Sequence, residues 1–332
     1  MREHRHTVAR ILDGGNPSHI AQAADALAAG RLVAFPTETV YGLGADAGQD
    51  AAVAGIFAAK GRPANHPLIV HVPNAASALP LARAIPPAAQ RLMDAFWPGP
   101  LTVIVPRRDG VATAAAGGQD TLGLRCPAHP VAQALLQACA ERGLIGLAAP
   151  SANQFGRVSP TTAAHVAGEF GDDVLVLDGG ACPVGIESTI IDCSRGRAVL
   201  LRPGTLTRGQ IEAALGEPVH DRDAQAPRAS GTLVSHYAPR ASVRLMSADV
   251  LQTALEVLGT GPEGVALYSR TVRPPRGMLH RAMPEDAARA AQELFAVLRD
   301  LDARGVRLIW VESPPPGPEW DGVRDRLTRA AA

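Results

Sequence analysis

The chain has 332 residues, a length that favours about two domains of ~100–200 residues each. Basic and acidic residues number 32 each, so the formal net charge is zero, and no block of Lys or Arg stands out. This balance argues against a primary role in strong, direct binding of nucleic acid or of a membrane surface, which requires a basic face.

The cysteines and the N-terminus indicate a cytoplasmic protein. Cys126, Cys139, Cys182 and Cys193 lie far apart without a C-x-x-C pair, which argues against a zinc site or a disulfide framework. No apolar core of the signal-peptide type follows residues 1–6, and no apolar run approaches the ~18 residues of a membrane span.

Residues 1–204 alternate between helix and strand patterns, which predicts a mixed α/β domain. Helices are predicted over residues 17–30, 50–60, 86–96, 130–142 and 159–170, the last capped at Ser159–Thr161. Strands are predicted over residues 32–35, 68–72, 101–105, 121–125, 144–149, 174–177 and 198–201.

The segment after the first strand combines hydroxyls, a carboxylate and glycines. Pro36 ends regular pairing because it has no N–H, and Thr37, Glu38 and Thr39 follow it. Gly42 and Gly44 then predict a glycine-rich turn that lets the backbone approach a ligand. An ordinary strand exit, with one of the threonines capping the next helix, explains the same residues equally well.

Four cations follow secondary elements: Lys60, Arg62, Arg125 and Arg202. Each alone is compatible with an ordinary surface charge, and Lys60 with a helix-dipole partner. Together they fall where strand ends converge in an α/β domain, which is where ligands collect. Hydrogen bonds to charged groups contribute roughly 1.5–3 kcal/mol each, so three or four approach the ~8 kcal/mol of micromolar binding.

Several standard sites are absent from the sequence. There is no G-x-x-x-x-G-K-[ST] loop, no G-x-G-x-x-G fingerprint, no G-x-S-x-G elbow and no H-E-x-x-H helix. Without a P-loop, the four scattered cations could still hold a triphosphate.

The last third of the chain predicts a linker and a second domain. Residues 205–240 contain a short helix over 208–215 and a polar segment that ends in Ser235-His236-Tyr237-Ala238-Pro239, and we interpret them as an interdomain linker. Residues 241–332 predict strands over 243–246, 265–268 and 306–311, and helices over 249–258, 285–304 and 320–329. This β-α-β-α-β-α order predicts a small, mostly parallel, Rossmann-like α/β domain.

Short segments of the chain resemble the sequence motifs of a known family and occur in the same order along the chain. They are residues 35–44, 60–63, 68–71, 97–102, 124–127, 150–153, 188–192 and 202–204, together with the linker motif His236-Tyr237-Ala238-Pro239. Nearly the whole chain resembles the YrdC-like threonylcarbamoyl-AMP synthases in their long, two-domain form. The resemblance implies a YrdC-like twisted mixed sheet with flanking helices, followed by the smaller C-terminal domain.

The resemblance also implies an activity. The family condenses L-threonine, bicarbonate and ATP into threonylcarbamoyl-adenylate, a nucleotidyl transfer that releases pyrophosphate. The product serves the t6A modification of tRNA and passes to a downstream tRNA threonylcarbamoyl-transferase complex. Mg²⁺ is expected to arrive on the phosphates of ATP, without a metal site made by protein ligands alone.

Site residues follow by position from the same resemblance. Threonine would contact Thr39, His71, Arg125, Ala149 and Ser188. ATP would contact Lys60, Arg62, His66, Thr121, Ser151, Asn153, Ser159, Arg202 and Tyr237, of which Lys60 and Arg62 are the catalytic candidates. His66 stands where the family usually has Asn, Ala149 replaces a frequent Thr, and residues 230–233 lack the family's basic residue.

Two other readings compete with the synthase. The same fold could hold nucleotide or RNA without chemistry, although the neutral charge speaks against RNA. A related domain occurs in carbamoyl transfer for hydrogenase maturation, but the zinc-finger cysteines of that assembly are missing here.

Overall fold

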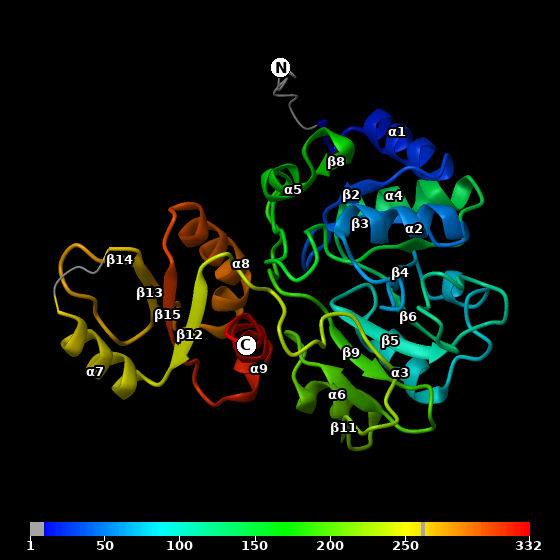
Figure 1. The fold of residues 1–332 in the computed structure, drawn as a ribbon. Coiled ribbons are helices and arrows are strands. Elements are labelled where there is room, and N and C mark those ends of the chain that lie inside the picture. Colours follow the sequence, from blue (N-terminus) through cyan, green and yellow to red (C-terminus); the bar gives the residue numbers. More distant parts are fainter. Residues whose placement is uncertain (1–9, 260–262) are drawn as a thin grey trace, which may run out of the picture.

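The computed structural model describes residues 10–259 and 263–332, so the N-terminal residues 1–6 considered above lie outside the described part. Figure 1 shows two α/β units side by side, with the chain crossing between them once through a long irregular segment. Helices α8 and α9 of the second unit (orange and red) face the first unit.

The first unit is built on one large sheet. Its strands are β1 (Ile11–Asp13), β2 (Val33–Phe35), β3 (Gly42–Asp46), β4 (Ile69–His71), β5 (Leu101–Pro106), β6 (Thr121–Arg125), β7 (Leu147–Ala148), β8 (Leu175–Asp178), β9 (Thr189–Asp192), β10 (Val199–Arg202) and β11 (His220–Asp221). Its helices are α1 (Pro17–Ala28), α2 (Asp50–Lys60), α3 (Pro87–Phe96), α4 (Pro130–Glu141), α5 (Ala163–Phe170) and α6 (Arg208–Leu215), with 3₁₀ turns at Ala76–Ala78 and Gly171–Asp173.

The sheet is mixed, as predicted, and its strands run in the order β1-β8-β2-β3-β7-β4-β6-β5-β9-β10-β11. Strands β4 and β6 are parallel neighbours, and His71 lies directly beside Arg125 in their register. The predicted strand over 144–149 is shorter, because only Leu147–Ala148 pair. Strands β1, β9 and β11 were not predicted, since strands of two to four residues leave little periodic signal.

The predicted glycine-rich turn is wrong. Gly42 and Gly44 belong to β3, which pairs antiparallel with β2, and no helix begins there for Thr37 or Thr39 to cap. The glycines serve close packing instead of a turn: a Cβ on Gly44 would lie 2.8 Å from the ring of Phe35. The predicted cap at Ser159–Thr161 is also wrong, because Thr162 caps α5 through the N–H of His165.

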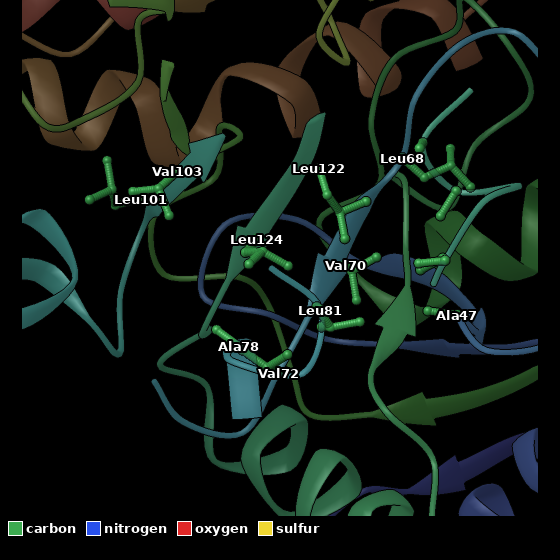
Figure 2. Packing of buried hydrophobic residues seen from close by; sticks show 14 of the residues in the cluster. Ala47, Leu68, Val70, Val72, Ala78, Leu81, Leu101, Val103, Leu122 and Leu124 are labelled. Carbon is green, nitrogen blue, oxygen red and sulfur yellow. The ribbon is translucent and has the colours of Figure 1, made fainter. Parts of the chain in front are cut away.

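Side chains along the central strands alternate between the hydrophobic core and the opposite face of the sheet. Successive side chains of a strand point to opposite faces. Figure 2 shows one face of β4, β5 and β6 packed in the main hydrophobic cluster, through Val70, Leu101, Val103, Leu122 and Leu124. The residues that alternate with them in sequence therefore face the other way, and these include His71 after Val70 and Arg125 after Leu124.

The second unit is a parallel four-stranded sheet in the order β12-β15-β13-β14. Its elements are β12 (Ser242–Met246), α7 (Ala248–Leu258), β13 (Val265–Ser269), β14 (Leu279–Ala282), α8 (Ala287–Ala303), β15 (Leu308–Glu312), a 3₁₀ turn at Pro318–Trp320 and α9 (Asp321–Ala330). The parallel sheet is confirmed, and β14 is an addition to the three predicted strands.

The core of the second unit continues into the first unit and the connecting segment. Val40, Val158, Ile186 and Tyr237 belong to the same buried cluster as the inner side chains of α8 and α9. Helix α6 and β11 pack on the first unit, since Ile211 lies in the main cluster and β11 pairs with β10. The second unit therefore packs directly against the residues that follow β2.

Candidate active site

A cavity that is partly open to solvent, with about 510 Å³ of empty space, lies on the open face of β4 and β6. Strand ends of the first unit and the connecting segment form its walls, from Thr37, Val40, Gly42, Arg62, Ile69, His71, Arg125, Ala149, Pro150, Ser151, Glu187, Ser188, Arg202, Ser230, Gly231, His236 and Tyr237. Three of the four predicted cations, Arg62, Arg125 and Arg202, meet here although 140 positions separate the first from the last in sequence.

Arg125 is fixed at one end of the cavity. Its Nη1 donates to Thr39 Oγ1 at 2.8 Å, and its Nη2 lies 2.7 Å from Glu38 Oε1 in a buried ion pair. Thr39 itself lies behind the cavity wall, while Ala149 and Ser188 line it. Thr102 and Ser188 share a hydrogen bond of 2.8 Å between their hydroxyls.

His71 stands next to Arg125 as a neutral ring. It is 3% exposed, and burial together with the Arg125 charge lowers its pKa from 6.5 to about 3. Its Nδ1 has no hydrogen-bond partner among the described residues. A buried ring nitrogen without a partner beside a guanidinium is suited to a hydrogen bond with a small polar ligand.

Arg62 and Arg202 form the other end. Arg62 Nη2 donates to Pro67 O at 2.9 Å and to Ser230 Oγ at 3.2 Å. Arg202 Nη1 donates to Ser230 O at 2.9 Å, and its Nη2 donates to Ser188 O at 2.9 Å. Ser230 of the connecting segment thus accepts hydrogen bonds from both guanidinium groups. Burial lowers the pKa of Arg62 to about 10.

Lys60 supports the cavity from behind. Its Nζ donates to Ser151 O at 2.6 Å and also to Asn153 O, which ties the end of α2 to the loop after β7. Burial, and then the neighbouring Arg62, hold the pKa of Lys60 well below its usual value. Asn153 donates to Gln154 O and Arg157 O, and its Oδ1 is buried without a partner among the described residues.

The remaining predicted residues lie around the cavity. Six of them do not line it: Thr39, Lys60, His66, Thr121, Asn153 and Ser159. His66 is half-buried and packs edge-on against Phe155 with ring centroids 5.4 Å apart. Ser159 is buried, and its Oγ donates to Glu187 Oε1 at 2.5 Å.

Thr121 lines a second cavity of about 310 Å³ that shares Ile69 and Ser230 with the first. Its walls are mostly apolar, from Leu68, Ile104, Leu122 and Ile190 among others, and Gln119 and Arg228 are the larger polar side chains that line it. The Thr121 hydroxyl is buried and has no partner among the described residues. A mostly apolar slot with one free hydroxyl, which meets Arg62 and Arg202 at Ser230, is suited to an aromatic base attached to phosphates.

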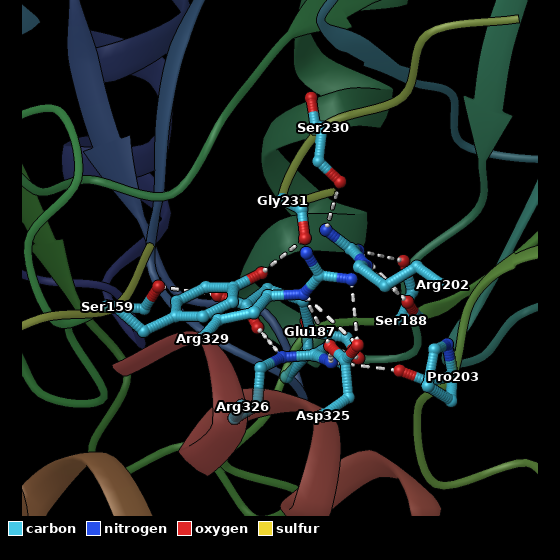
Figure 3. A network of polar contacts seen from close by, with 12 residues as sticks. Ser159, Glu187, Ser188, Arg202, Pro203, Ser230, Gly231, Asp325, Arg326 and Arg329 are labelled. Atoms are coloured by element: carbon cyan, nitrogen blue, oxygen red, sulfur yellow. Dashed lines mark hydrogen bonds and ion pairs between the residues drawn. The ribbon is translucent and has the colours of Figure 1, made fainter. Parts of the chain in front are cut away.

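Two carboxylates and a distant arginine were not among the predicted site residues. Glu38 holds Arg125, and Glu187 lines the cavity while Arg326 of α9 donates to it (Figure 3). Glu38 stands inside a segment that the family resemblance covers, and Glu187 directly precedes another, so their neighbours offered a signal. Arg326 lies in a helix with an ordinary amphipathic pattern, and its sequence context gives no indication of this contact.

Tyr237 connects the cavity to the second unit. It is buried, has φ of 62°, and stacks on Phe295 of α8 with centroids 5.4 Å apart. Arg326 lies over its ring at 5.2 Å. The predicted role of Tyr237 at the cavity is thus compatible with its position between the two units.

Comparison with known proteins gives two family matches that together cover most of the chain. A family model described as "Telomere recombination" matches residues 25–204, and one described as "Threonylcarbamoyl-AMP synthase, C-terminal domain" matches residues 206–332.

Individual relatives match along the full length. The Pyrococcus abyssi threonylcarbamoyl-AMP synthase is 39% identical over 322 residues, covering 93% of each chain. The Bacillus subtilis threonylcarbamoyl-AMP synthase is 38% identical, covering 95% of this chain and 94% of that protein. The solved structure of P. abyssi Sua5 complexed with L-threonine superposes with a TM-score of 0.85 at 36% identity, covering 95% of both chains.

Proposed function

We propose that this chain, which belongs to the threonylcarbamoyl-AMP synthase family, is an L-threonylcarbamoyladenylate synthase. It would condense L-threonine, bicarbonate and ATP and release pyrophosphate. The observation that carries the proposal is the single cavity in which Arg125 and His71 at one end face Arg62 and Arg202 at the other.

Threonine would bind at the Arg125 end. The guanidinium, held by Glu38 and Thr39, would pair with the amino-acid carboxylate, since Arg recognises carboxylates through its planar fork of donors. The neutral His71 ring would hydrogen-bond a polar group of the substrate. Ser188 and the backbone of Ala149 would close the pocket.

ATP would bind at the other end. Arg62, Arg202 and Ser151 would face the phosphates, with Lys60, Asn153 and Ser159 supporting that wall, and the base would enter the slot that holds the Thr121 hydroxyl. His66, beside Arg62 and Phe155, would border the nucleotide. Because Ser230 now accepts from both guanidinium groups, residues 230–237 would have to shift before phosphates take its place, and Tyr237 would then close over the nucleotide.

The chemistry needs positioning and charge neutralisation more than a side-chain nucleophile. The threonine nitrogen forms a bond to the bicarbonate carbon, with loss of water, and a carbamate oxygen then attacks the α-phosphorus of ATP. The bond from that phosphorus to the pyrophosphate oxygen breaks. Lys60, Arg62 and Arg202 would stabilise the charge that develops on the leaving pyrophosphate.

Mg²⁺ bound to the triphosphate would supply further neutralisation of that charge. Among residues 10–259 and 263–332, no cluster of three His, Cys, Asp or Glu side chains forms a cage for a metal. The metal would be held mainly by the phosphates of the substrate.

The product would serve tRNA modification in the cytoplasm through a separate threonylcarbamoyl-transferase complex. A mixed carbamic–phosphoric anhydride is an activated acyl group, so its use requires a second enzyme that transfers the threonylcarbamoyl group. No helix within the described residues has the length and apolarity needed to cross a membrane.

The test is pyrophosphate release by the full chain with ATP, L-threonine and bicarbonate, omitting one at a time. We expect release only with all three present, and threonylcarbamoyl-adenylate as the product by mass spectrometry. Nucleotide binding without turnover in the complete mixture would instead support a non-catalytic module of the same fold.

A further inference from the structure

A buried ion pair joins the two units at the wall of the cavity (Figure 3). Arg326 Nε of α9 donates to Glu187 Oε2 at 2.7 Å, and Arg326 Nη2 donates to Glu187 O at 3.1 Å. Arg326 is fully buried and Glu187 is 7% exposed. The second unit therefore places a charge directly behind a residue that lines the cavity.

Glu187 is a negative charge at the end of the cavity proposed for phosphates. Burial alone would raise its pKa, but Arg326, Arg202 and the hydrogen bond from Ser159 hold the pKa below its ordinary value, so the group is ionised at neutral pH. An ionised carboxylate beside a triphosphate opposes binding unless a cation neutralises it.

Arg326 is held in place by contacts on several sides. Its Nη1 donates to Pro203 O at 2.9 Å and to Asp325 Oδ2 at 2.8 Å. Helix α9 approaches the backbone after β10 so closely that a Cβ on Gly322 would lie 2.6 Å from Gly204 O. The guanidinium is thus fixed against the strand end that carries Arg202.

Arg202 does not use its donors on the carboxylate. It donates to Ser188 O and Ser230 O, while both oxygens of Glu187 are engaged by Ser159 and Arg326. If Arg326 were absent, the free carboxylate would be drawn toward Arg202, the other buried cation whose charge acts on it.

We propose that Arg326 is a positioning residue of the ATP site, which neutralises Glu187 and so keeps this carboxylate from competing with phosphate for Arg202. This inference rests on the proposed function, because it assigns the phosphates to the Arg202 end of the cavity. It gives the second unit an electrostatic part in nucleotide binding, in addition to any part in covering the cavity.

A role in docking alone is the competing explanation, and the chain contains a matched control. Arg299 of α8 pairs with Glu169 of α5 at 2.7 Å, and both side chains are mostly buried. This pair also joins the two units, and Arg299 donates further to the backbone carbonyls of Val158 and Ser159. Neither Arg299 nor Glu169 lines the cavity or contacts Glu187. Loss of docking should therefore affect Arg326→Met and Arg299→Met alike, whereas loss of neutralisation affects only the first.

The experiment compares steady-state kinetics of the wild type, Arg326→Met, Glu187→Gln, the double variant and Arg299→Met. We expect Arg326→Met to raise the KM for ATP about tenfold or more, with the KM for threonine within about threefold. Glu187→Gln in the same chain should restore most of the ATP affinity. Glu187→Gln alone should not raise the KM for ATP, since Asp325 still pairs with Arg326.

Each other outcome overturns the inference. If the double variant has a KM for ATP as high as that of Arg326→Met, Arg326 only docks the units. The same conclusion follows if Arg299→Met raises the KM for ATP as much as Arg326→Met does. Should Arg326→Met fail to fold, Glu187→Gln and the double variant decide, because a docking role predicts weaker ATP binding in both. A wild-type chain that makes no product would reject the proposed function itself, before any variant is compared.

Discussion

Replacing Arg125 by Ala tests the threonine pocket most directly. The side chain is buried, and it is the cation placed to receive the amino-acid carboxylate beside His71. Hydrogen bonds to charged groups contribute about 1.5–3 kcal/mol each. Two such bonds to a carboxylate amount to about 3–6 kcal/mol, which corresponds to a loss in threonine affinity of about 100-fold or more.

The same substitution removes the partner of Glu38. A buried carboxylate left without its cation costs about 3–5 kcal/mol of folding stability, so Arg125→Ala is expected to unfold at lower denaturant concentration than the wild type. Glu38→Gln in the same chain should recover much of this stability without restoring threonine affinity. The double variant therefore separates the folding effect from the binding effect.

The assay is pyrophosphate release at saturating ATP over a range of threonine concentrations, with ATP binding measured separately by calorimetry. We expect the KM for threonine to rise about 100-fold or more, and ATP affinity to remain within about threefold of the wild type. The exposed Arg91→Ala serves as a control. Unchanged threonine dependence in the folded double variant would refute the assignment of the carboxylate to Arg125.

Three further predictions concern pH, the support of the cavity and the sheet. The buried neutral His71 and His236 each have a pKa lowered from 6.5 to about 3. Between these pH values the unfolded chain binds more protons than the folded chain, so stability falls as the pH drops below 6.5. Urea unfolding at pH 5 should show a loss of about 2 kcal/mol for each histidine, and His71→Gln should remove its share of the pH dependence. Lys60→Met leaves the carbonyls of Ser151 and Asn153 without their donor. We therefore expect at least about tenfold weaker ATP binding by calorimetry and a free energy of unfolding about 1–3 kcal/mol lower. An ATP affinity equal to that of the wild type would contradict the supporting role of Lys60. Gly44→Ala brings a methyl group within 2.8 Å of the Phe35 ring and should destabilise the chain by about 1–3 kcal/mol in chemical denaturation, whereas a neutral effect would show that the ring shifts freely.

The sequence alone determined most of the helices and the longer strands. Their periodic apolar positions and their capping residues lie within a few residues of one another, as in α1 with its Asn16 cap and α6 with its capping box at Thr207. The family resemblance also singled out Arg62, Arg125 and Arg202, and the structure brings them together in one cavity.

Other features depend on contacts between distant parts of the chain, which local patterns do not record. The prediction of a turn at Gly42 and Gly44 is wrong because the sequence does not show which side chains pack against a glycine. In the structure these side chains are Phe35 and Ala149, which leave little room for a Cβ. Short strands such as β9 exist only because neighbouring strands pair with them.

The tertiary structure alone decided which charges meet. Glu187 and Arg326 are 139 positions apart, and an ordinary helical pattern surrounds the arginine. Packing of α9 against the end of β10 brings the two side chains together. Burial removes water from the ionised carboxylate, so a fixed cation becomes its most favourable partner. That pairing, and with it the charge of the cavity, was set by the arrangement of the two units in space.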